Sequence, residues 1–245
     1  VELPSKGRYY PEGHPLCGKG DIEIRHMTAK DEDILTSETL IKKGIAVDRL
    51  LENVVVDKSI DIKSLLIGDK NSLVVATRIT GYGSEYHTKL SCPSCMKTVE
   101  QTFDLENYNM YNAEPDDFVG EDINISSMGT FELTMPISDA KVEVRLMNGH
   151  DEDYLISQSE MKRKRKLLET SLTDQLRRMI VSVNGDSSGD MKEAFLQHMP
   201  ARDSRYLRTM YQKVVPDIDL AQEFTCASCG YAQELEVPFT VDFFC

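Results

Sequence analysis

The chain has 245 residues, of which 40% are hydrophobic, so it can bury one sizeable core or two modest domains. Its net charge of −13 would repel a nucleic-acid backbone from the molecule as a whole, which favours protein partners. No run approaches the roughly 18 apolar residues of a membrane span, and the first residues lack the features of a signal peptide. We therefore expect a soluble cytosolic protein that makes no membrane contact.

Residues 1–27 are predicted to form an extended N-terminal arm, because their prolines and glycines disfavour a helix or a central strand. Such an arm either wraps its own domain or docks on a neighbouring protein. We predict the second, with Tyr9 and Tyr10 as partner-binding anchors, since aromatic side chains dominate docking interfaces. His14 and Cys17 have ligand-like spacing, but one pair cannot complete a metal site, and a turn with a small buried Cys17 is the simpler interpretation.

Residues 28–83 are predicted to form a helical segment. The stretch MTAKDEDILTSETLIKKG is typical of one helix, capped by Thr28 with Asp31 three residues later and followed by Gly44. A second helix is indicated by apolar residues at helical spacing: Val47, Leu50, Leu51, Val54 and Val55. A third helix is predicted over about 70–80, although its β-branched residues also allow a strand.

Two Cys-x-x-Cys motifs share one pattern, since Cys226 and Cys229 follow Cys92 and Cys95 at the same separation of 134 residues. Apolar residues alternate with polar ones beside each motif, which indicates strand, knuckle and strand in both places. Residues 84–106 and 217–245 are thus predicted to be the two halves of a zinc ribbon with a long insertion between them. Four thiolates would surround one structural Zn²⁺ per chain and leave no position for water, so the metal would stabilise the fold without catalysing a reaction.

A redox role for the two motifs is the alternative. It requires an attacking cysteine at the start of a helix within a βαβ unit, and neither motif has that setting. Two independent dithiols nevertheless stay open as an interpretation. A disulfide framework is disfavoured in a chain of this length without an export signal.

Residues 107–153 are predicted to form an acidic, β-containing insertion. Between residues 104 and 153 there are thirteen acidic residues against only Lys141 and Arg145, so this part faces water or a basic partner. The stretches FELTMPI and KVEVRLM alternate as strands on either side of Ser138 and Asp139, which predicts a β-hairpin.

Residues 154–216 are predicted to be helical again. One helix is indicated by a stripe that ends at Asn184 and Gly185, and its members are Leu172, Leu176, Met179, Ile180 and Val183. Two shorter helices follow, one ending at Pro200 and one before Pro216. The five basic residues at 162–166 would spread around a helix, so we expect local ion pairs there rather than a binding site.

No pattern in the sequence indicates catalysis. The histidines are scattered, no phosphate-binding glycine loop occurs, and no two carboxylates are singled out as an acid–base pair. Cys245 is the last residue and is expected to be free. We therefore predict no enzyme and no small-molecule substrate, and an α+β fold: a helical core with a split four-cysteine zinc ribbon and a small acidic β-containing insertion.

Several ordered blocks resemble one known family. The stretches LPSKGRYYPEGHPL, IEIRHMTAKDEDIL and LLIGDKNSLVVATRITGYGSEY, followed by a Cys-Pro-x-Cys knuckle, resemble the baseplate proteins of T4-like contractile-tailed phages, which are described as hub subunits or hub assembly proteins. The resemblance covers most of residues 3–105. It implies a role in building the tail baseplate, with other baseplate proteins as partners, located in the host bacterial cytoplasm during assembly or in the virion tail baseplate.

A zinc-ribbon regulatory module that binds nucleic acid or the transcription machinery is the alternative function. Such a ribbon would carry basic and aromatic residues on its strands. The strands beside these motifs instead carry acidic residues, namely Glu100, Asp104, Glu106, Glu223, Glu234 and Glu236. The baseplate interpretation is therefore preferred, and nucleic acid is not expected as a partner.

Overall fold

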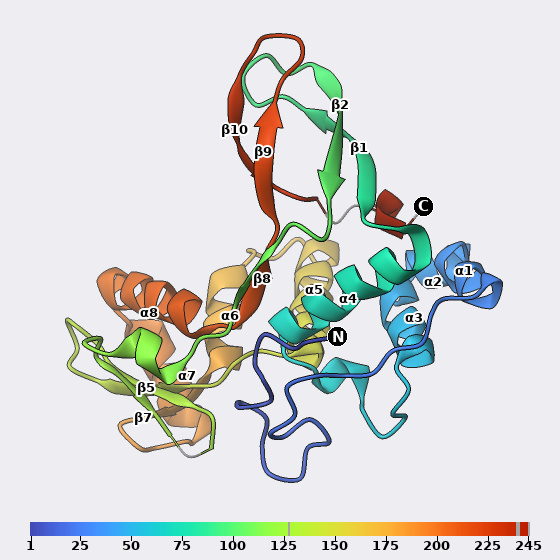
Figure 1. The fold of residues 1–245 in the computed structure, drawn as a ribbon. Helices are drawn as coiled ribbons and strands as arrows, with labels where there is room; N and C mark the ends of the chain where they lie inside the picture. Colours follow the sequence, from blue (N-terminus) through green and yellow to red (C-terminus); the bar gives the residue numbers. More distant parts are fainter. Residues whose placement is uncertain (127, 239–240, 245) are drawn as a thin grey trace.

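The structure, a computed structural model, describes residues 1–126, 128–238 and 241–244. Helices and short sheets form a body from which two β-hairpins project (Figure 1). The mixture of helices and strands fits the α+β class expected from the sequence.

The helices are α1 (Ala29–Leu35), α2 (Glu38–Lys42), α3 (Ala46–Val54), α4 (Ile67–Tyr82), α5 (Gly149–Lys164), α6 (Ser171–Met179), α7 (Gly189–His198) and α8 (Ala201–Val214). Short 3-10 helices lie at Ile62–Ser64, Pro115–Phe118 and Val241–Phe244. The strands are β1 (Glu85–Ser91), β2 (Thr98–Asp104), β3 (Asn109–Tyr111), β4 (Ile123–Ile125), β5 (Phe131–Thr134), β6 (Lys141–Val144), β7 (Ile180–Val183), β8 (Asp217–Asp219), β9 (Ala221–Thr225) and β10 (Ala232–Glu236). All pairings are antiparallel: β1 with β2, β9 with β10, β3 with β8, and a four-stranded sheet in the order β4-β5-β6-β7.

One hydrophobic core serves the whole body. Its buried side chains come from the N-terminal segment, from α3, α4, α6 and α8, and from the four-stranded sheet. A second, smaller cluster at the hairpins contains Cys92, Phe224 and Cys226. The arm, the two helical segments and the acidic insertion expected from the sequence thus share one core.

The helices predicted over 47–55 and 70–80 are confirmed as α3 and α4, but the single helix predicted after residue 27 is wrong. The capping box of Thr28 with Asp31 is present at the start of α1. The helix then breaks at Thr36 and Ser37. The Thr36 hydroxyl donates a 3.0 Å hydrogen bond to the Glu32 carbonyl, and Ser37 adopts an extended conformation as the N-cap of α2. Threonine and serine compete with the helical backbone in this way.

The helix predicted to run to Val183 is also shorter than expected. It ends at Met179 as α6, and the next four residues form β7 against β6. Ile180, Val181 and Val183 are β-branched and favour a strand. Their apolar side chains would fit a helix or a strand, so only the pairing with β6 selects the strand.

The β-hairpin predicted around Ser138 and Asp139 is confirmed, since β5 pairs with β6 across that turn. It is not part of a separate lobe, because β6 also pairs with β7 from the following helical segment. The helical segment also begins earlier than residue 154, with α5 starting at Gly149. Pairing between distant strands thus crosses the boundary expected between the acidic insertion and the helices.

The N-terminal arm packs on its own chain. Tyr9 and Tyr10 are only 7% and 5% exposed. The Tyr9 ring lies 5.2 Å from the Phe131 ring, and the Tyr10 hydroxyl donates to the Asp69 carboxylate at 2.8 Å. This chain supplies both an aromatic neighbour and a buried hydrogen-bond acceptor, so the arm wraps its own domain. A partner-binding role for Tyr9 and Tyr10 stays a prediction.

Asp69 is the polar centre of this packing. Its carboxylate accepts hydrogen bonds from the Ser5 amide at 2.9 Å and from the Ser5 hydroxyl at 2.6 Å, as well as from Tyr10. Burial raises the pKa of Asp69, while these hydrogen bonds act in the opposite direction. Gly7 has a φ of +71°, and a Cβ there would lie 2.4 Å from the Lys19 backbone, so the arm needs glycine at its tightest approach.

Cys17 lies in a turn closed by a hydrogen bond from its own amide to the His14 carbonyl, at 2.9 Å. Its side chain is exposed, so the prediction of a buried cysteine is wrong. Cys245 lies outside the described residues.

The two halves of the chain repeat one backbone arrangement. Each begins with an antiparallel pair closed by the same hydrogen bond: the Leu3 amide donates to the Gly20 carbonyl at 2.8 Å, and the Met135 amide donates to the Ala140 carbonyl at 2.9 Å. A proline follows the donor in both copies. The connection between the paired segments is long in the first copy and a tight turn in the second.

The next stretch is repeated in sequence as well. Residues 25–33 read RHMTAKDED, and residues 145–153 read RLMNGHDED. The Arg25 guanidinium binds both carboxylate oxygens of Asp31 at 2.7 and 2.9 Å, and Arg145 binds Asp151 at 2.7 and 2.8 Å. Each aspartate also closes the capping box of the helix that it begins. Arg178 gives Asp151 a second guanidinium partner.

The repeat continues to the projecting hairpins. Asp69 and Asp203 are the third residues of α4 and α8, and both are fully buried. Asp203 accepts from the Ile137 amide at 2.9 Å, which is the counterpart of the Ser5 contact with Asp69. Each copy then ends in a hairpin with one Cys-x-x-Cys motif. We call residues 1–104 the first repeat and residues 131–238 the second repeat.

We predict that Tyr10→Phe lowers the free energy of unfolding by about 1–3 kcal/mol, because Asp69 and the Leu66 amide both lose a buried partner. Thermal melting measures the change, at about 2–4 °C for each kcal/mol in a chain of this size. Tyr231→Phe is the matched control, since its hydroxyl contacts Gln233 at the surface. Equal melting temperatures for the two variants would contradict the packing of the arm on its own chain.

We also predict that Asp151→Asn destabilises the chain by about 2–4 kcal/mol, because two partly exposed arginines lose their buried carboxylate. Asp31→Asn, at the matching position of the first repeat, should cost less, since the described partners of Asp31 include one arginine. Burial raises the pKa of Asp151, but Arg145 and Arg178 outweigh it and hold the pKa below its usual range. The contribution of Asp151 is therefore present above the unfolded pKa of about 4 and is lost as the pH falls through the lower folded pKa. Urea titrations at pH 7 and pH 3 should show the gap between wild type and variant shrinking in acid; a constant gap would refute the ion-pair explanation.

Candidate metal centre

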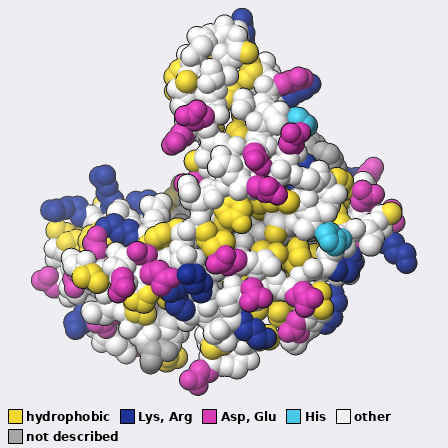
Figure 2. Space-filling model, in the orientation of Figure 1, with side chains coloured by type: hydrophobic (Ala, Val, Ile, Leu, Met, Phe, Trp, Pro, Cys, Tyr) yellow, Lys and Arg dark blue, Asp and Glu magenta, His cyan; other side chains and the backbone are white. Residues whose placement is uncertain are grey.

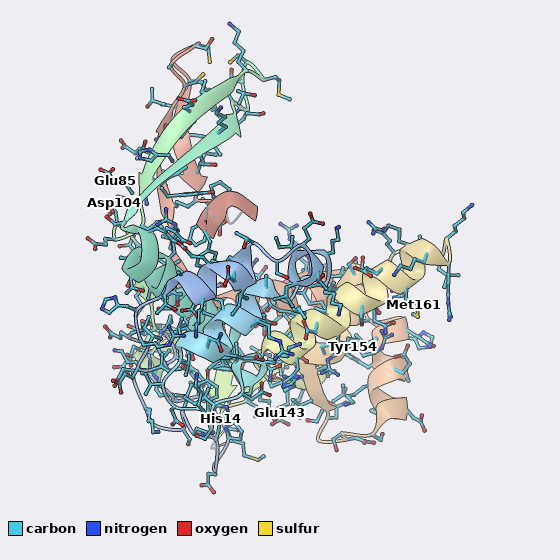
Figure 3. All side chains as sticks on the ribbon, turned by 90° about the vertical axis from the view of Figure 1, so that its right-hand side faces the viewer. His14, Glu85, Asp104, Glu143, Tyr154 and Met161 are labelled. Atoms are coloured by element: carbon cyan, nitrogen blue, oxygen red, sulfur yellow. The ribbon has the colours of Figure 1, made fainter. Side chains whose placement is uncertain are left out.

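The two projecting hairpins hold the four motif cysteines at their tips. In the first, the Cys92 amide donates to the Lys97 carbonyl at 2.9 Å, and in the second, the Cys226 amide donates to the Tyr231 carbonyl at 2.8 Å. Figure 3 labels Glu85 and Asp104, which are paired at the base of the first hairpin. The strand, knuckle and strand order expected from the sequence is thus present in both hairpins.

The two knuckle turns have the same conformation. The amide of Met96 donates to the Cys92 carbonyl at 2.9 Å, and the amide of Gly230 donates to the Cys226 carbonyl at 2.9 Å. Met96 and Gly230 both have positive φ, at 58° and 71°. Glycine adopts this conformation without strain, whereas methionine does so at some cost.

The structure brings the four sulfurs of Cys92, Cys95, Cys226 and Cys229 within 4.8 Å of one another. Two contacts cross between the hairpins: Cys92 to Cys229 and Cys95 to Cys226, both at 3.8 Å. A Zn–S bond of about 2.3 Å in a regular tetrahedron separates sulfurs by about 3.8 Å. The four side chains can therefore hold one metal ion between the repeats, as their spacing in the sequence predicted.

The electrostatics of the cluster favour a cation. Loss of hydration opposes ionisation of Cys226, but the amides of Ser228 and Cys229 donate to its sulfur and lower its pKa to about 7. The amide of Tyr231 lowers the pKa of Cys229, but loss of hydration and the neighbouring sulfurs outweigh it and raise that pKa to about 11. Cys226 ionises readily, and its negative charge then opposes the ionisation of Cys229. Ionisation of all four sulfurs therefore requires a positive charge among them.

Little apolar contact holds the hairpins together without the cysteines. Phe224 is buried beside Cys92 and Cys226, with Leu90, Val99 and Leu235 packed around them. This cluster adjoins the main core through Leu90, which packs against both. A metal ion would therefore contribute a large part of the free energy that fixes one hairpin against the other.

Other candidate groups do not gather into a site. His14 contacts Ser64, His87 contacts Thr102, and His150 contacts Asp61. Within residues 1–126, 128–238 and 241–244, the cysteine cluster is the one group of three or more metal-ligating side chains close enough to share an ion. In the basic run, Lys162 binds Asp174 and Lys164 binds Glu160 at 3.2 Å, as the expectation of local ion pairs predicted.

None of the helices in the described part of the chain is both long and apolar enough to span a membrane.

Comparison with known proteins gives one match. The family described as "T4 bacteriophage base plate protein" matches residues 1–245, so the match includes both repeats and all four motif cysteines. No curated protein and no solved structure matched the chain.

We predict one tightly bound metal ion per chain, shared between the repeats. Elemental analysis of purified protein should show that Cys95→Ser and Cys226→Ser lose the ion equally, because each repeat supplies two ligands to one site. Both variants should also melt at a lower temperature, since metal affinity is linked to folding. Cys17→Ser is the control and should keep the ion, because Cys17 lies outside the cluster. A ligand variant that retained the full metal content would refute the shared site.

Proposed function

The chain belongs to the T4 bacteriophage base plate protein family, and on that premise we propose that it is a structural or assembly component of the hub or wedge region of a contractile-tail baseplate. The family match over residues 1–245 is the observation that carries this proposal. A baseplate is a multiprotein assembly, so the partners would be other baseplate proteins. The chain would act through protein–protein contacts, in the host bacterial cytoplasm during assembly and then in the virion tail.

We propose zinc as the metal. Four cysteine sulfurs at tetrahedral spacing form the donor set that proteins use for structural zinc. With four protein ligands the coordination is complete, so the ion would stabilise the fold and would not activate water. The ion would join Cys92 and Cys95 of the first repeat to Cys226 and Cys229 of the second.

Surface charge supports a protein partner over nucleic acid for the hairpins. Their strands carry exposed acidic residues, namely Glu85, Glu100, Asp104, Glu223, Glu234 and Glu236. Figure 2 shows acidic side chains along the projecting hairpins. A zinc-ribbon module that binds nucleic acid would place basic and aromatic side chains there, so this second candidate function has less support.

We predict that an epitope-tagged copy of the chain, expressed during phage infection, co-sediments with baseplate intermediates on a density gradient. Cys92→Ser should reduce that association, because the repeats lose their shared ion, whereas Cys17→Ser should leave it intact. Mass spectrometry of purified virions then separates the two roles: a structural subunit stays in the particle, and an assembly protein leaves it. If the tagged wild-type chain is found in no baseplate fraction and in no virion, the proposed function is refuted.

A further inference from the structure

We propose that a groove on the second repeat, between α5, α6 and α8, binds an acidic amphipathic helix of another baseplate protein. This inference rests on the proposed function and names the kind of partner. It is carried by the shape and lining of the groove, by a comparison with the first repeat, and by the charges around the groove.

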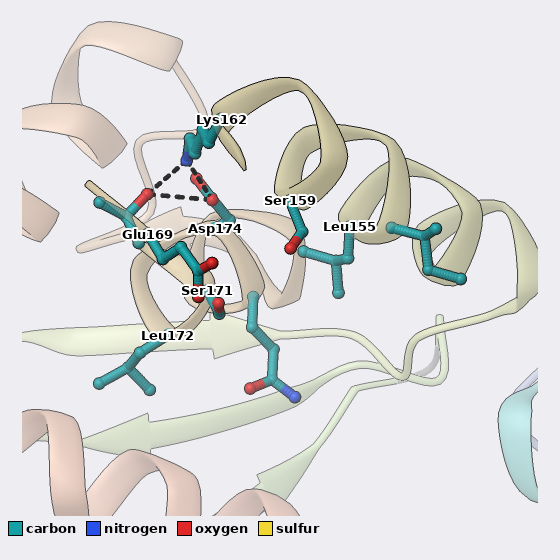
Figure 4. Close-up of a pocket in the computed structure, with 10 residues that line it drawn as sticks. Leu155, Ser159, Lys162, Glu169, Ser171, Leu172 and Asp174 are labelled. Carbon is teal, nitrogen blue, oxygen red and sulfur yellow. Dashed lines mark hydrogen bonds and ion pairs between the residues drawn. The ribbon is translucent and has the colours of Figure 1, made fainter. Parts of the chain in front are cut away.

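The groove consists of two adjoining hollows of about 440 and 340 Å³ that share Leu172 and Gln175. Figure 4 shows the first hollow, where Leu155 of α5 and Leu172 of α6 line the space and Lys162 binds Asp174 at one end. The second hollow continues between α6 and α8, where Met179 and Tyr211 line it. The first hollow is therefore mainly apolar, whereas the second mixes apolar side chains with polar and basic ones.

The first repeat buries three of the positions that line this groove. α3 and α6 end alike, since the amide of Val55 donates to the Leu51 carbonyl and the amide of Ile180 donates to the Leu176 carbonyl. Aligned from these ends, Ala46 and Leu50 of α3 match Ser171 and Gln175 of α6. Aligned from the capping aspartates of α1 and α5, Leu35 matches Leu155. The first-repeat residues are at most 9% exposed: Leu35 8%, Ala46 9% and Leu50 0%. Their counterparts line the open groove.

The two repeats differ because their chains take different paths after the shared aspartate cap. In the first repeat the chain turns at Thr36 and returns through α2 to α3. In the second, α5 runs on to Lys164 without a turn, and Figure 3 shows it extending away from the body past Tyr154 and Met161. Large apolar side chains are left exposed there: Ile156 60%, Leu167 53%, Leu168 83% and Leu172 41%. Ile156 and Leu172 line the groove, and exposed apolar side chains of this kind are typical of a binding surface.

Charge at both ends of the groove specifies the partner. At the α5 end, four exposed basic residues follow Lys162, namely Arg163, Lys164, Arg165 and Lys166, of which Lys164 is paired with Glu160. At the α8 end, the exposed Arg205 and Arg208 line the second hollow. Figure 2 shows Lys and Arg side chains gathered over the part of the molecule that carries α8. The whole chain has a net charge of −13, so this basic surface stands out against the rest and fits an acidic ligand.

The apolar lining of the first hollow favours a protein ligand over nucleic acid. A phosphate backbone would satisfy the arginines and lysines but would leave Leu155, Ile156 and Leu172 without apolar partners. A helix with leucines on one face and glutamates or aspartates beside them satisfies both kinds of side chain, which is how amphipathic helices bind grooves between helices. Two acidic residues line the groove, Glu169 and Asp174. Asp174 is already paired with Lys162 and Arg177, so it opposes such a ligand little. The exposed Glu169 lies shortly after the basic run of residues 162–166.

The test uses the full chain and fluorescent peptides of about 20 residues, a helix length of about 30 Å, that tile the other baseplate proteins of the same phage. Fluorescence anisotropy measures their dissociation constants. We expect the bound peptides to be acidic and amphipathic, and their affinity to fall at least about tenfold in Leu172→Asp and in the Arg205→Glu/Arg208→Glu double variant. The control is Lys42→Glu/Lys43→Glu, which makes the same charge change on α2 of the first repeat and should bind normally. Metal content and melting temperature confirm that each variant is folded.

Three binding results would overturn the inference: no peptide binds more tightly than about 1 mM, the bound peptides are insensitive to both groove variants, or double-stranded DNA binds with the sensitivity expected of the peptides. The failure of the groove is distinguishable from the failure of the proposed function. Folded groove variants that still co-sediment with baseplate intermediates as wild type does would refute the groove alone. A wild-type chain absent from those intermediates would refute the proposed function.

Discussion

The four sulfurs at the hairpin tips are the contact on which the arrangement of the two projecting hairpins depends. They come from positions far apart in the chain, yet they lie within 4.8 Å of one another, closer than four ionised thiols would stay without a cation. The surrounding apolar cluster is small and adjoins the main core through Leu90. A single ion at this point would therefore fix the end of the first repeat to the end of the second, while the main core fixes their beginnings.

The local interactions that the repeats share are those that fix the backbone. Arg25 with Asp31 and Arg145 with Asp151 close the same helix cap, and Asp69 and Asp203 bind amides at the start of their own repeats. Each of these aspartates is buried, and the hydrogen-bond donors named here lie in its own repeat. Each repeat therefore stabilises its own backbone through these polar contacts. The connecting segments have diverged: the first repeat has a long arm before residue 20, and the second has a long α5. Surfaces available to partners are expected where the copies differ, because the shared parts are already occupied by internal contacts.

The sequence predicted the features that depend on local patterns. The capping box at Thr28, the hairpin around Ser138 and the grouping of the four cysteines all follow from residues close together or from an obvious repeat of spacing. The features that were missed depend on partners distant in the chain: β7 exists because β6 is beside it, and the arm is buried because Asp69 accepts its hydroxyls. The duplication could have been found from sequence, since RHMTAKDED and RLMNGHDED carry the same arginine, methionine and acidic triplet. Comparing the two knuckles alone located only the ends of the repeats.

Acidic and basic side chains are concentrated on different parts of the molecule. Acidic side chains follow the projecting hairpins, whereas arginines and lysines gather over α8 (Figure 2). Exposed basic residues also lie at the end of α5. A partner with an acidic surface would be attracted to the basic end and repelled from the hairpins, so the encounter would be oriented before close contact is made. The apolar lining of the first hollow of the groove would then retain the partner through burial of side chains such as Leu172, which salt weakens much less than it weakens ion pairs at the rim. Long-range charge would thus govern the rate of capture, and apolar burial would govern how long the partner stays.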